Sequence, residues 1–173
     1  MKRINFERAS GDDMGMDKYL IFKLGAGMYG ASVTKIKKVE LEVNIVPVVQ
    51  AEENSCFVSG LSQVKGSMIP VFDLKKRLAL GETELTPTTG TLIVDVNKDD
   101  GVYTNGVLVD EVCEIREIKK ENIRSSYDVR SNTRRVRDFI SGVGEVEGRE
   151  ISLLNLPRIL ELTPDLYTAL EQN

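Results

Sequence analysis

The residues whose types and spacing suggest chemistry form one glycine-rich run. Gly25–Gly30 (GAGMYG) matches the G-x-G-x-x-G fingerprint that cradles the pyrophosphate of dinucleotides, and it follows a predicted strand. Glu40 and Glu42 lie downstream, but earlier than the ~20-residue spacing expected for a ribose-binding acid. The rest of the chain predicts hairpins rather than the alternating helices of a parallel sheet, so glycines of a hairpin turn explain the run better. A nucleotide-binding enzyme that uses this run is the remote alternative.

The chain contains no histidine, which removes the commonest general base and the commonest metal ligand. Ser–His and Cys–His nucleophile pairs are absent as well, and the chain cannot accept a phosphoryl group on histidine. Carboxylate or lysine chemistry stays open in principle. Cys56 and Cys113 are isolated, which supports neither a disulfide framework nor a metal site. The sequence therefore predicts a protein that is not an enzyme and holds no cofactor or metal.

Composition narrows the class of protein further. The length of 173 residues, with 41% hydrophobic and 29% charged side chains, suits one soluble globular domain. A net charge of −4 and only 6% aromatic residues argue against nucleic acid as a partner. No apolar stretch approaches the roughly 20 residues of a membrane span, and Met1–Asp17 lacks the apolar segment of a signal peptide. We therefore expect a cytoplasmic protein with no direct membrane insertion and with a flexible tail over residues 1–17.

Short apolar runs separated by turn residues predict an all-β fold. The expected strands are Tyr19–Leu24, Met28–Val33, Ile36–Leu41, Ile45–Val49 at a sheet edge, Thr91–Val96, Val102–Asp110, Glu111–Ile118 and Phe139–Leu156. Short helices are expected at Leu74–Leu80 and Pro157–Leu162, and a final helix within residues 163–173.

Two strands carry irregular patterns. Asn105-Gly106 follows the Asp100-Gly101 turn too closely for a second hairpin, so Gly106 is interpreted as a bulge. Val112 and Ile115 fall on opposite faces of a regular strand.

An internal repeat organises the chain. Phe57–Leu78 (FVSGLSQVKGSMIPVFDLKKRL) matches Phe139–Leu160 (FISGVGEVEGREISLLNLPRIL) without a gap, 82 positions later. The identical pairs are Phe57/Phe139, Ser59/Ser141, Gly60/Gly142, Val64/Val146, Gly66/Gly148, Ile69/Ile151, Leu74/Leu156 and Leu78/Leu160. Each half thus predicts a strand, a hairpin, a strand, a glycine-bracketed hairpin and a short helix, over residues 18–85 and 91–162.

The repeated glycines have structural explanations. Gly60 and its equivalent Gly142 let a strand bend or bulge, whereas Gly66 and Gly148 supply a turn conformation that other residues resist. Each half, at about 70 residues, is marginal as an independent core, so we expect the two halves to pack together.

The ordered motifs resemble those of CheW-like domains. They are Tyr19–Gly30, Phe57–Leu78, Val107–Asp110 and Phe139–Leu156, within a resemblance that covers about residues 18–162. The resemblance implies two intertwined five-stranded β-barrels with a hydrophobic core between them. It also implies a chemotaxis adaptor that couples the histidine kinase CheA, through its regulatory domain, to the cytoplasmic tips of chemoreceptors. Other CheW-like proteins are further candidate partners, and recruitment to receptor arrays would follow from these contacts.

The resemblance also assigns candidate partner-binding residues. Lys65 stands where the family usually has an arginine associated with receptor binding, and lysine keeps the charge but loses the planar fork. Ile36 and Lys38 match a surface strand tied to partner binding, where the family often has an acid in place of Lys38. Val112 and Ile115 match part of a receptor-binding groove. Arg124, with Tyr127 beside it, matches a basic position implicated in contacts with the kinase.

The alternative keeps the fold but changes the partners. A CheW-like scaffold of a non-chemotaxis kinase pathway, or of an accessory array, would fit the departures at Lys65 and Lys38.

Overall fold

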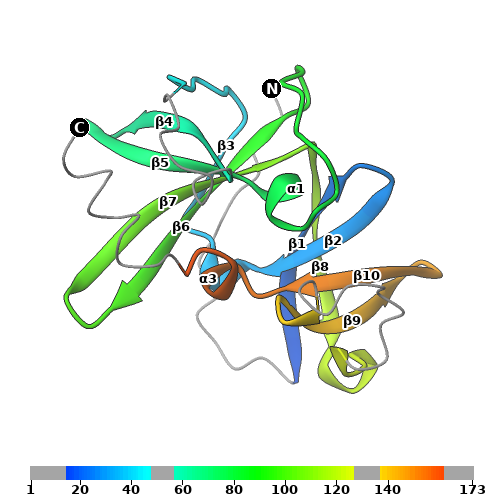
Figure 1. The fold of residues 1–173 in the computed structure, drawn as a ribbon. Helices are drawn as coiled ribbons and strands as arrows, with labels where there is room; N and C mark the ends of the chain where they lie inside the picture. Colours follow the sequence, from blue (N-terminus) through cyan, green and yellow to red (C-terminus); the bar gives the residue numbers. More distant parts are fainter. Residues whose placement is uncertain (1–14, 48–56, 127–136, 162–173) are drawn as a thin grey trace.

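The computed structural model describes residues 15–47, 57–126 and 137–161 (Figure 1). In chain order its elements are β1 (Met16–Leu24), β2 (Gly27–Ser32), η1 (Val33–Lys35), β3 (Lys38–Glu40), β4 (Val58–Val64), β5 (Ser67–Asp73), α1 (Leu74–Arg77), β6 (Gly90–Lys98), β7 (Gly101–Val109), β8 (Glu111–Lys119), η3 (Lys120–Asn122), β9 (Ile140–Val146), β10 (Arg149–Leu154) and α3 (Leu156–Ile159). The predicted all-β fold with short helices is confirmed. The tail prediction is wrong at its end, because Met16 and Asp17 already pair with β8. The predicted final helix lies outside the described residues.

The strands form two five-stranded sheets, in the orders β8-β1-β2-β10-β9 and β3-β6-β7-β5-β4. The first is called barrel A below and the second barrel B. Neighbouring strands are antiparallel except for β2 with β10 and β5 with β7, which run parallel. Figure 1 shows the two sheets side by side, with α1 and α3 between them.

The two halves of the sequence exchange hairpins. If β1 to β5 are matched in order with β6 to β10, both sheets have the same strand order. Barrel A takes the β1–β2 hairpin from the first half and β8, β9 and β10 from the second, whereas barrel B takes β6–β7 from the second half and β3, β4 and β5 from the first. Neither half can complete a sheet without the other, so the predicted intertwining is confirmed.

Within the described residues, one bridge joins the two edges of each sheet. Val46, which follows β3, exchanges two backbone hydrogen bonds of 2.8 and 2.9 Å with Leu61 of β4. Arg124, which follows β8, does the same with Val143 of β9 at 2.9 and 3.0 Å. Gly60 and Gly142 make both approaches possible. A Cβ on Gly60 would lie 2.3 Å from the carbonyl oxygen of Val46, and one on Gly142 would lie 2.6 Å from Ile123 Cγ2.

The repeated hairpins have matching bulges and turns. The register of each shifts by one residue, between Val58 and Gly60 in β4 and opposite Leu153 and Leu154 in β9, which confirms the expected bulge beside each glycine. Gly66 (φ 83°) and Gly148 (φ 76°) have the positive φ expected of them. Lys65 (φ 48°) and Glu147 (φ 52°) share this conformation, so both connections are two-residue turns with positive φ at both positions.

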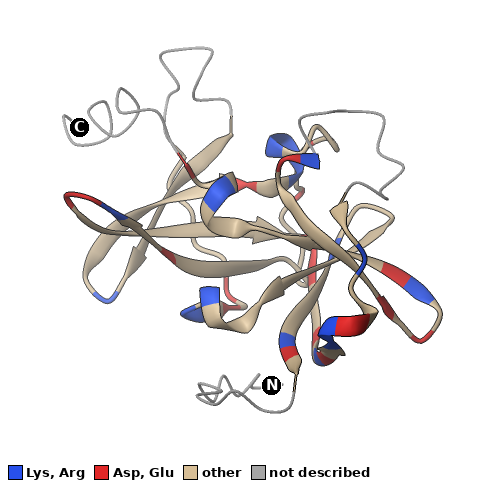
Figure 2. Ribbon diagram, turned by 90° about the horizontal axis from the view of Figure 1, so that it is seen from below, with Lys and Arg blue, Asp and Glu red and all other residues tan. Residues whose placement is uncertain are grey.

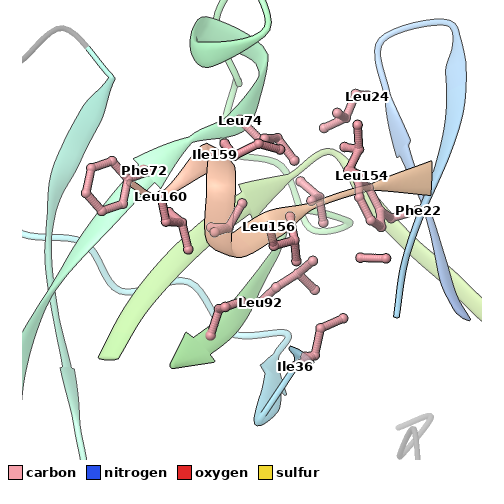
Figure 3. Packing of buried hydrophobic residues seen from close by; sticks show 14 of the residues in the cluster. Phe22, Leu24, Ile36, Phe72, Leu74, Leu92, Leu154, Leu156, Ile159 and Leu160 are labelled. Atoms are coloured by element: carbon pink, nitrogen blue, oxygen red, sulfur yellow. The ribbon is translucent and has the colours of Figure 1, made fainter. Parts of the chain in front are cut away.

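The largest hydrophobic cluster lies between the barrels, as the resemblance implied. Its buried members come from both sheets and from both helices, and they include Leu20, Phe22, Leu92, Val94, Phe72, Leu74, Leu154 and Leu156. Figure 3 shows the side chains of α3 and of the residue after it, Leu156, Ile159 and Leu160, pointing into this layer. A smaller cluster of Ile21, Ile118, Ile151 and Leu153 fills barrel A. Alternate residues of β1 thus serve two cores, as the two-residue period of a strand requires.

Two local interpretations are corrected by the structure. Gly106 is not a bulge, since β6 and β7 pair without a register shift and Gly106 lies opposite Ile93. A Cβ there would lie 2.9 Å from Thr91 Cγ2 and 3.1 Å from Val71 Cγ2, so glycine is needed for close packing of side chains. Gly25–Gly30 forms the turn and second strand of the antiparallel β1–β2 hairpin. Because the motif continues into strand β2 and does not open an α-helix, the dinucleotide-binding alternative loses its structural context.

Candidate partner-binding surfaces

The first candidate surface joins the two barrels and is called the β3–β8 surface. It consists of Val39 and Leu41 at the edge of barrel B and of Val112 and Ile115 on β8, the edge of barrel A. Gly90, the first residue of β6, lies beneath it. A Cβ on Gly90 would be 2.8 Å from Val112 Cγ2 and 3.8 Å from Leu41 Cδ2, so the missing side chain lets the two barrels approach here.

A bulge in β8 explains why Val112 and Ile115 can act together. Phe22 of β1 pairs with Val112 and Ile21 pairs with Glu114, which leaves Cys113 as an extra residue. The bulge moves Val112 and Ile115 to the same face, and both are half-buried against the inter-barrel core. Cys113 packs instead against the interior of barrel A, and burial together with Glu111 raises the pKa of its thiol. The prediction that Val112 and Ile115 lie on opposite faces is therefore wrong.

Charged side chains on and beside the strands β3 and β8 form opposite-sign pairs. Lys38 forms an ion pair with Glu40, two residues along the same strand. Lys23 pairs with Glu111 at 3.0 Å, and this hydrogen bond raises the lysine pKa. In Figure 2 the basic and acidic positions are interspersed along strands and turns. Partner recognition at this surface would therefore depend more on its apolar centre than on a field of one sign.

Ile36 is not a surface residue. It is only 5% exposed and belongs to the inter-barrel core, where Figure 3 shows it below Leu92. The chain turns through η1 before β3 begins at Lys38, so Ile36 precedes the regular strand. The expectation that Ile36 contacts a partner from a surface strand is corrected by this burial.

The second candidate surface lies on the β4–β5 hairpin and is called the Lys65 surface. Val46 lies opposite Leu61, and Met68 lies opposite Gln63 two residues further along β4, so Val46 and Met68 share a face. Val46 is 60% exposed and Met68 51%. Lys65 stands at the hairpin turn, and none of the ion pairs between described residues involves it.

The equivalent hairpin of barrel A has a different environment. Glu147, at the position of Lys65, accepts a hydrogen bond of 2.9 Å from Arg116 of β8. Arg124 pairs with Glu150 of β10, so its guanidinium is already engaged within the fold although half of the side chain is exposed. Tyr127 lies outside the described residues. The two repeats thus present one hairpin turn with an unengaged lysine and one tied to β8.

Other kinds of site find no support within the described ranges. No group of three or more Cys, Asp or Glu side chains there is placed to hold a metal ion. Within the same residues no helix has the length and apolar character to cross a membrane.

Comparisons with known proteins place the fold in a family. Residues 18–163 match the model of the CheW-like domain, and the chain belongs to this family. The chemotaxis protein CheW of Rhizobium meliloti is 25% identical over 145 residues, which cover 84% of this chain and 88% of that protein. CheW of Klebsiella aerogenes is 21% identical over 153 residues, covering 88% and 86%. The crystal structure of the scaffolding protein TtCheW from Thermoanaerobacter tengcongensis is similar with a TM-score of 0.71 and 22% identity, covering 91% of this chain and 96% of that one.

Sequence reasoning missed several residues of both surfaces. Leu41 and Val39 were visible as a strand face, but nothing in their pattern distinguished an exposed site from a core. Gly90 lies outside the gapless repeat, so no matching glycine in the other half pointed to it. Val46 and Met68 were hidden because their exposure depends on which strands pair with β4.

Proposed function

We propose that this chain is a scaffold of chemotaxis arrays that couples the histidine kinase CheA to the cytoplasmic tips of chemoreceptors. Family membership supports this role, as do the names of its relatives, which are chemotaxis and scaffolding proteins. The structural observation that carries the proposal is the β3–β8 surface, where Leu41 is 45% exposed beside the half-buried Val112. Exposed apolar side chains at a junction of two packed units suit a protein partner. The role is non-catalytic and needs no cofactor.

The receptor would bind across the β3–β8 surface and the Lys65 surface. The six residues from Leu41 to Val46 connect the two, so one elongated partner can contact both. A helical hairpin would place apolar side chains against Leu41, Val112 and Ile115, and an acidic residue opposite Lys65. Lysine offers a point charge rather than a bidentate fork. It would therefore fix where along the receptor the chain binds, but would not restrict the angle of the contact.

The kinase would bind on the side of barrel A. Arg124 and Tyr127 remain the candidate residues, with Glu150 as an additional one because it already holds the Arg124 guanidinium. The regulatory domain of CheA is the proposed partner here, and a further CheW-like protein could occupy the same side. Individually weak contacts of this kind are strengthened when many copies assemble. The protein would be cytoplasmic and would reach membrane arrays through these partners.

Titration of a receptor-tip fragment and of the CheA regulatory domain tests the proposal. Lys65→Glu should lower receptor affinity by about tenfold or more, because a repelling charge replaces an attracting one. Kinase affinity and the unfolding midpoint should not change, since Lys65 lies on an open turn. Lys120→Glu is the matched control, as Lys120 is also exposed, directly follows β8 of barrel A and lies in a 3.9 Å pair with Asp17. If the wild-type chain bound neither fragment, the proposed coupling role would be contradicted.

A scaffold of another kinase pathway or of an accessory array is the second candidate. The internal pairing of Lys38 with Glu40 favours it, because a position where the family often has an acid is neutralised here within the chain. Complementation of a strain that lacks its own coupling protein separates the two, since restored chemotaxis supports the first role.

A further inference from the structure

The chain crosses from barrel B to barrel A through one residue. β7 ends at Val109 in barrel B, β8 begins at Glu111 in barrel A, and only Asp110 lies between them. The corresponding crossing in the first half, from β2 to β3, uses the five residues 33–37. The short crossing leaves little freedom in the direction that the chain takes from barrel B into barrel A. The contacts of Asp110 therefore bear directly on how the two barrels are oriented.

Asp110 is held by four residues from three segments of the chain. Its amide donates to the carbonyl of Lys23 at 3.0 Å, and its carbonyl accepts from Thr88 Oγ1 at 3.1 Å. Its carboxylate oxygen Oδ2 accepts from the amide of Gly25 at 2.6 Å and lies 3.2 Å from Lys75 Nζ. Gly25 belongs to the β1–β2 turn of barrel A, whereas Lys75 belongs to α1, which follows β5 of barrel B. One carboxylate oxygen therefore ties the two barrels together.

The ion pair of Lys75 with Asp110 is buried enough to affect how the barrels are held together. The side chains of Lys75 and Asp110 are 15% and 25% exposed, whereas the neighbouring pair of Lys76 with Glu82 is 30% and 72% exposed. Partial burial weakens screening by solvent, so the first pair contributes more than a surface pair does. Val112 follows Asp110 by two residues, and Gly90 pairs with Val109 on its other side. The contacts of Asp110 thus lie at the base of the β3–β8 surface.

We propose that Asp110 is a positioning residue for this surface: its carboxylate, between Gly25 and Lys75, fixes barrel A against barrel B and so sets the separation of Leu41 and Val112. This inference rests on the proposed function only in assigning a receptor to the surface. The side chain itself need not touch a partner. Its effect on binding passes through the barrel geometry.

Lys75→Met is the decisive variant, because it keeps the aliphatic stem and removes the ammonium. Lys76→Met is its matched control on the same helix, and Lys75→Arg restores the charge. Methyl NMR of Leu41 and Val112 gives a readout that needs no partner, since both side chains lie within 4 Å of one point above Gly90. We expect a weaker Leu41–Val112 NOE and shifted methyl signals in Lys75→Met, with Lys75→Arg and Lys76→Met like wild type.

Receptor affinity supplies the second readout. We expect Lys75→Met to lose about threefold to tenfold in affinity, as is typical of a residue that acts on binding through another element. Asp110→Asn, which keeps an acceptor for Gly25 but no charge for Lys75, should lose a similar factor. Unchanged Leu41–Val112 signals in both variants, or equal changes in Lys76→Met, would overturn the inference. If the wild-type chain binds no receptor, the proposed function fails while the NMR measurement still decides the role of Asp110.

Discussion

Arg77 donates a hydrogen bond of 3.3 Å from Nε to the carbonyl oxygen of Ile159, the residue that occupies its own position in the second repeat. Its guanidinium carbon also lies 4.7 Å from the ring centre of Phe57 and 4.9 Å from that of Phe139, which are likewise repeat equivalents. One side chain therefore contacts matching parts of both repeats.

Replacement of Arg77 should destabilise the whole domain. Two cation–π contacts and a hydrogen bond to a carbonyl predict a loss of about 2–3 kcal/mol for Arg77→Ala and about 1 kcal/mol for Arg77→Lys, which keeps the charge but not the planar group. Urea denaturation gives both values. Arg158→Ala, on the exposed face of α3, is the control and should change the free energy of unfolding by less than about 0.5 kcal/mol. Equal losses at positions 77 and 158 would contradict a special role for Arg77.

Asp73 and Asn155 cap equivalent helices with unequal networks. The Asp73 carboxylate is 1% exposed and accepts from the amides of Lys75, Lys76 and Thr83 and from Thr83 Oγ1. Among the described residues, the Asn155 side chain accepts only from the amide of Arg158. Asp73→Ala should therefore cost about 3 kcal/mol, against about 1 kcal/mol for Asn155→Ala. Thermal unfolding of the two variants compares them, and a larger loss at Asn155 would be inconsistent with the network around Thr83.

The closing bridges predict different costs at the two repeated glycines. A Cβ on Gly60 meets the backbone of Val46, which cannot move without breaking the bridge, and Gly60→Ala should cost about 3 kcal/mol. On Gly142 the overlap is smaller, because the nearest atom is Ile123 Cγ2 at 2.6 Å and the backbone oxygen of Arg124 lies at 3.1 Å, so Gly142→Ala should cost about 1–2 kcal/mol. Chemical denaturation measures the difference. Gly66→Ala separates packing from conformation, since its Cβ meets nothing within 4 Å and only the positive φ opposes it, at about 1 kcal/mol.

The sequence was sufficient for the local elements but not for their exchange between halves. Alternating apolar residues, the glycine turns and the gapless repeat predicted the hairpins that the structure contains. The exchange depends on the parallel pairs β2–β10 and β5–β7, which join strands far apart in the chain. The residues of these strands would have apolar neighbours whether or not the hairpins are exchanged. The exchange was therefore predicted only through the family resemblance. The bulge at Cys113 was equally invisible, because one extra residue reverses the faces that follow it.

The residues of the candidate surfaces also divide into those that the sequence could place and those that it could not. Lys65 could be placed on a turn from the Lys-Gly pair alone, and the structure has it there. Ile36 could not be told from a surface residue, since an apolar residue two positions before a short strand fits either environment. Leu41 is recognisable as a surface residue only from its position beside Gly90 and Val112. These residues are distant in sequence and meet where the barrels join.

Leu41 offers the sharpest separation of binding from stability. Its side chain is 45% exposed, so Leu41→Ser removes apolar surface at the centre of the β3–β8 surface with a loss of stability below about 1 kcal/mol. Receptor affinity should nevertheless fall about tenfold, because truncation of a central apolar contact costs more in a complex than in the free protein. Val102→Ser is the matched control, since Val102 is 62% exposed at the β6–β7 turn, outside both surfaces. Isothermal titration with a receptor-tip fragment measures both variants. Equal affinities for Leu41→Ser and Val102→Ser would remove the β3–β8 surface from the receptor interface and leave the Lys65 surface as its remaining candidate.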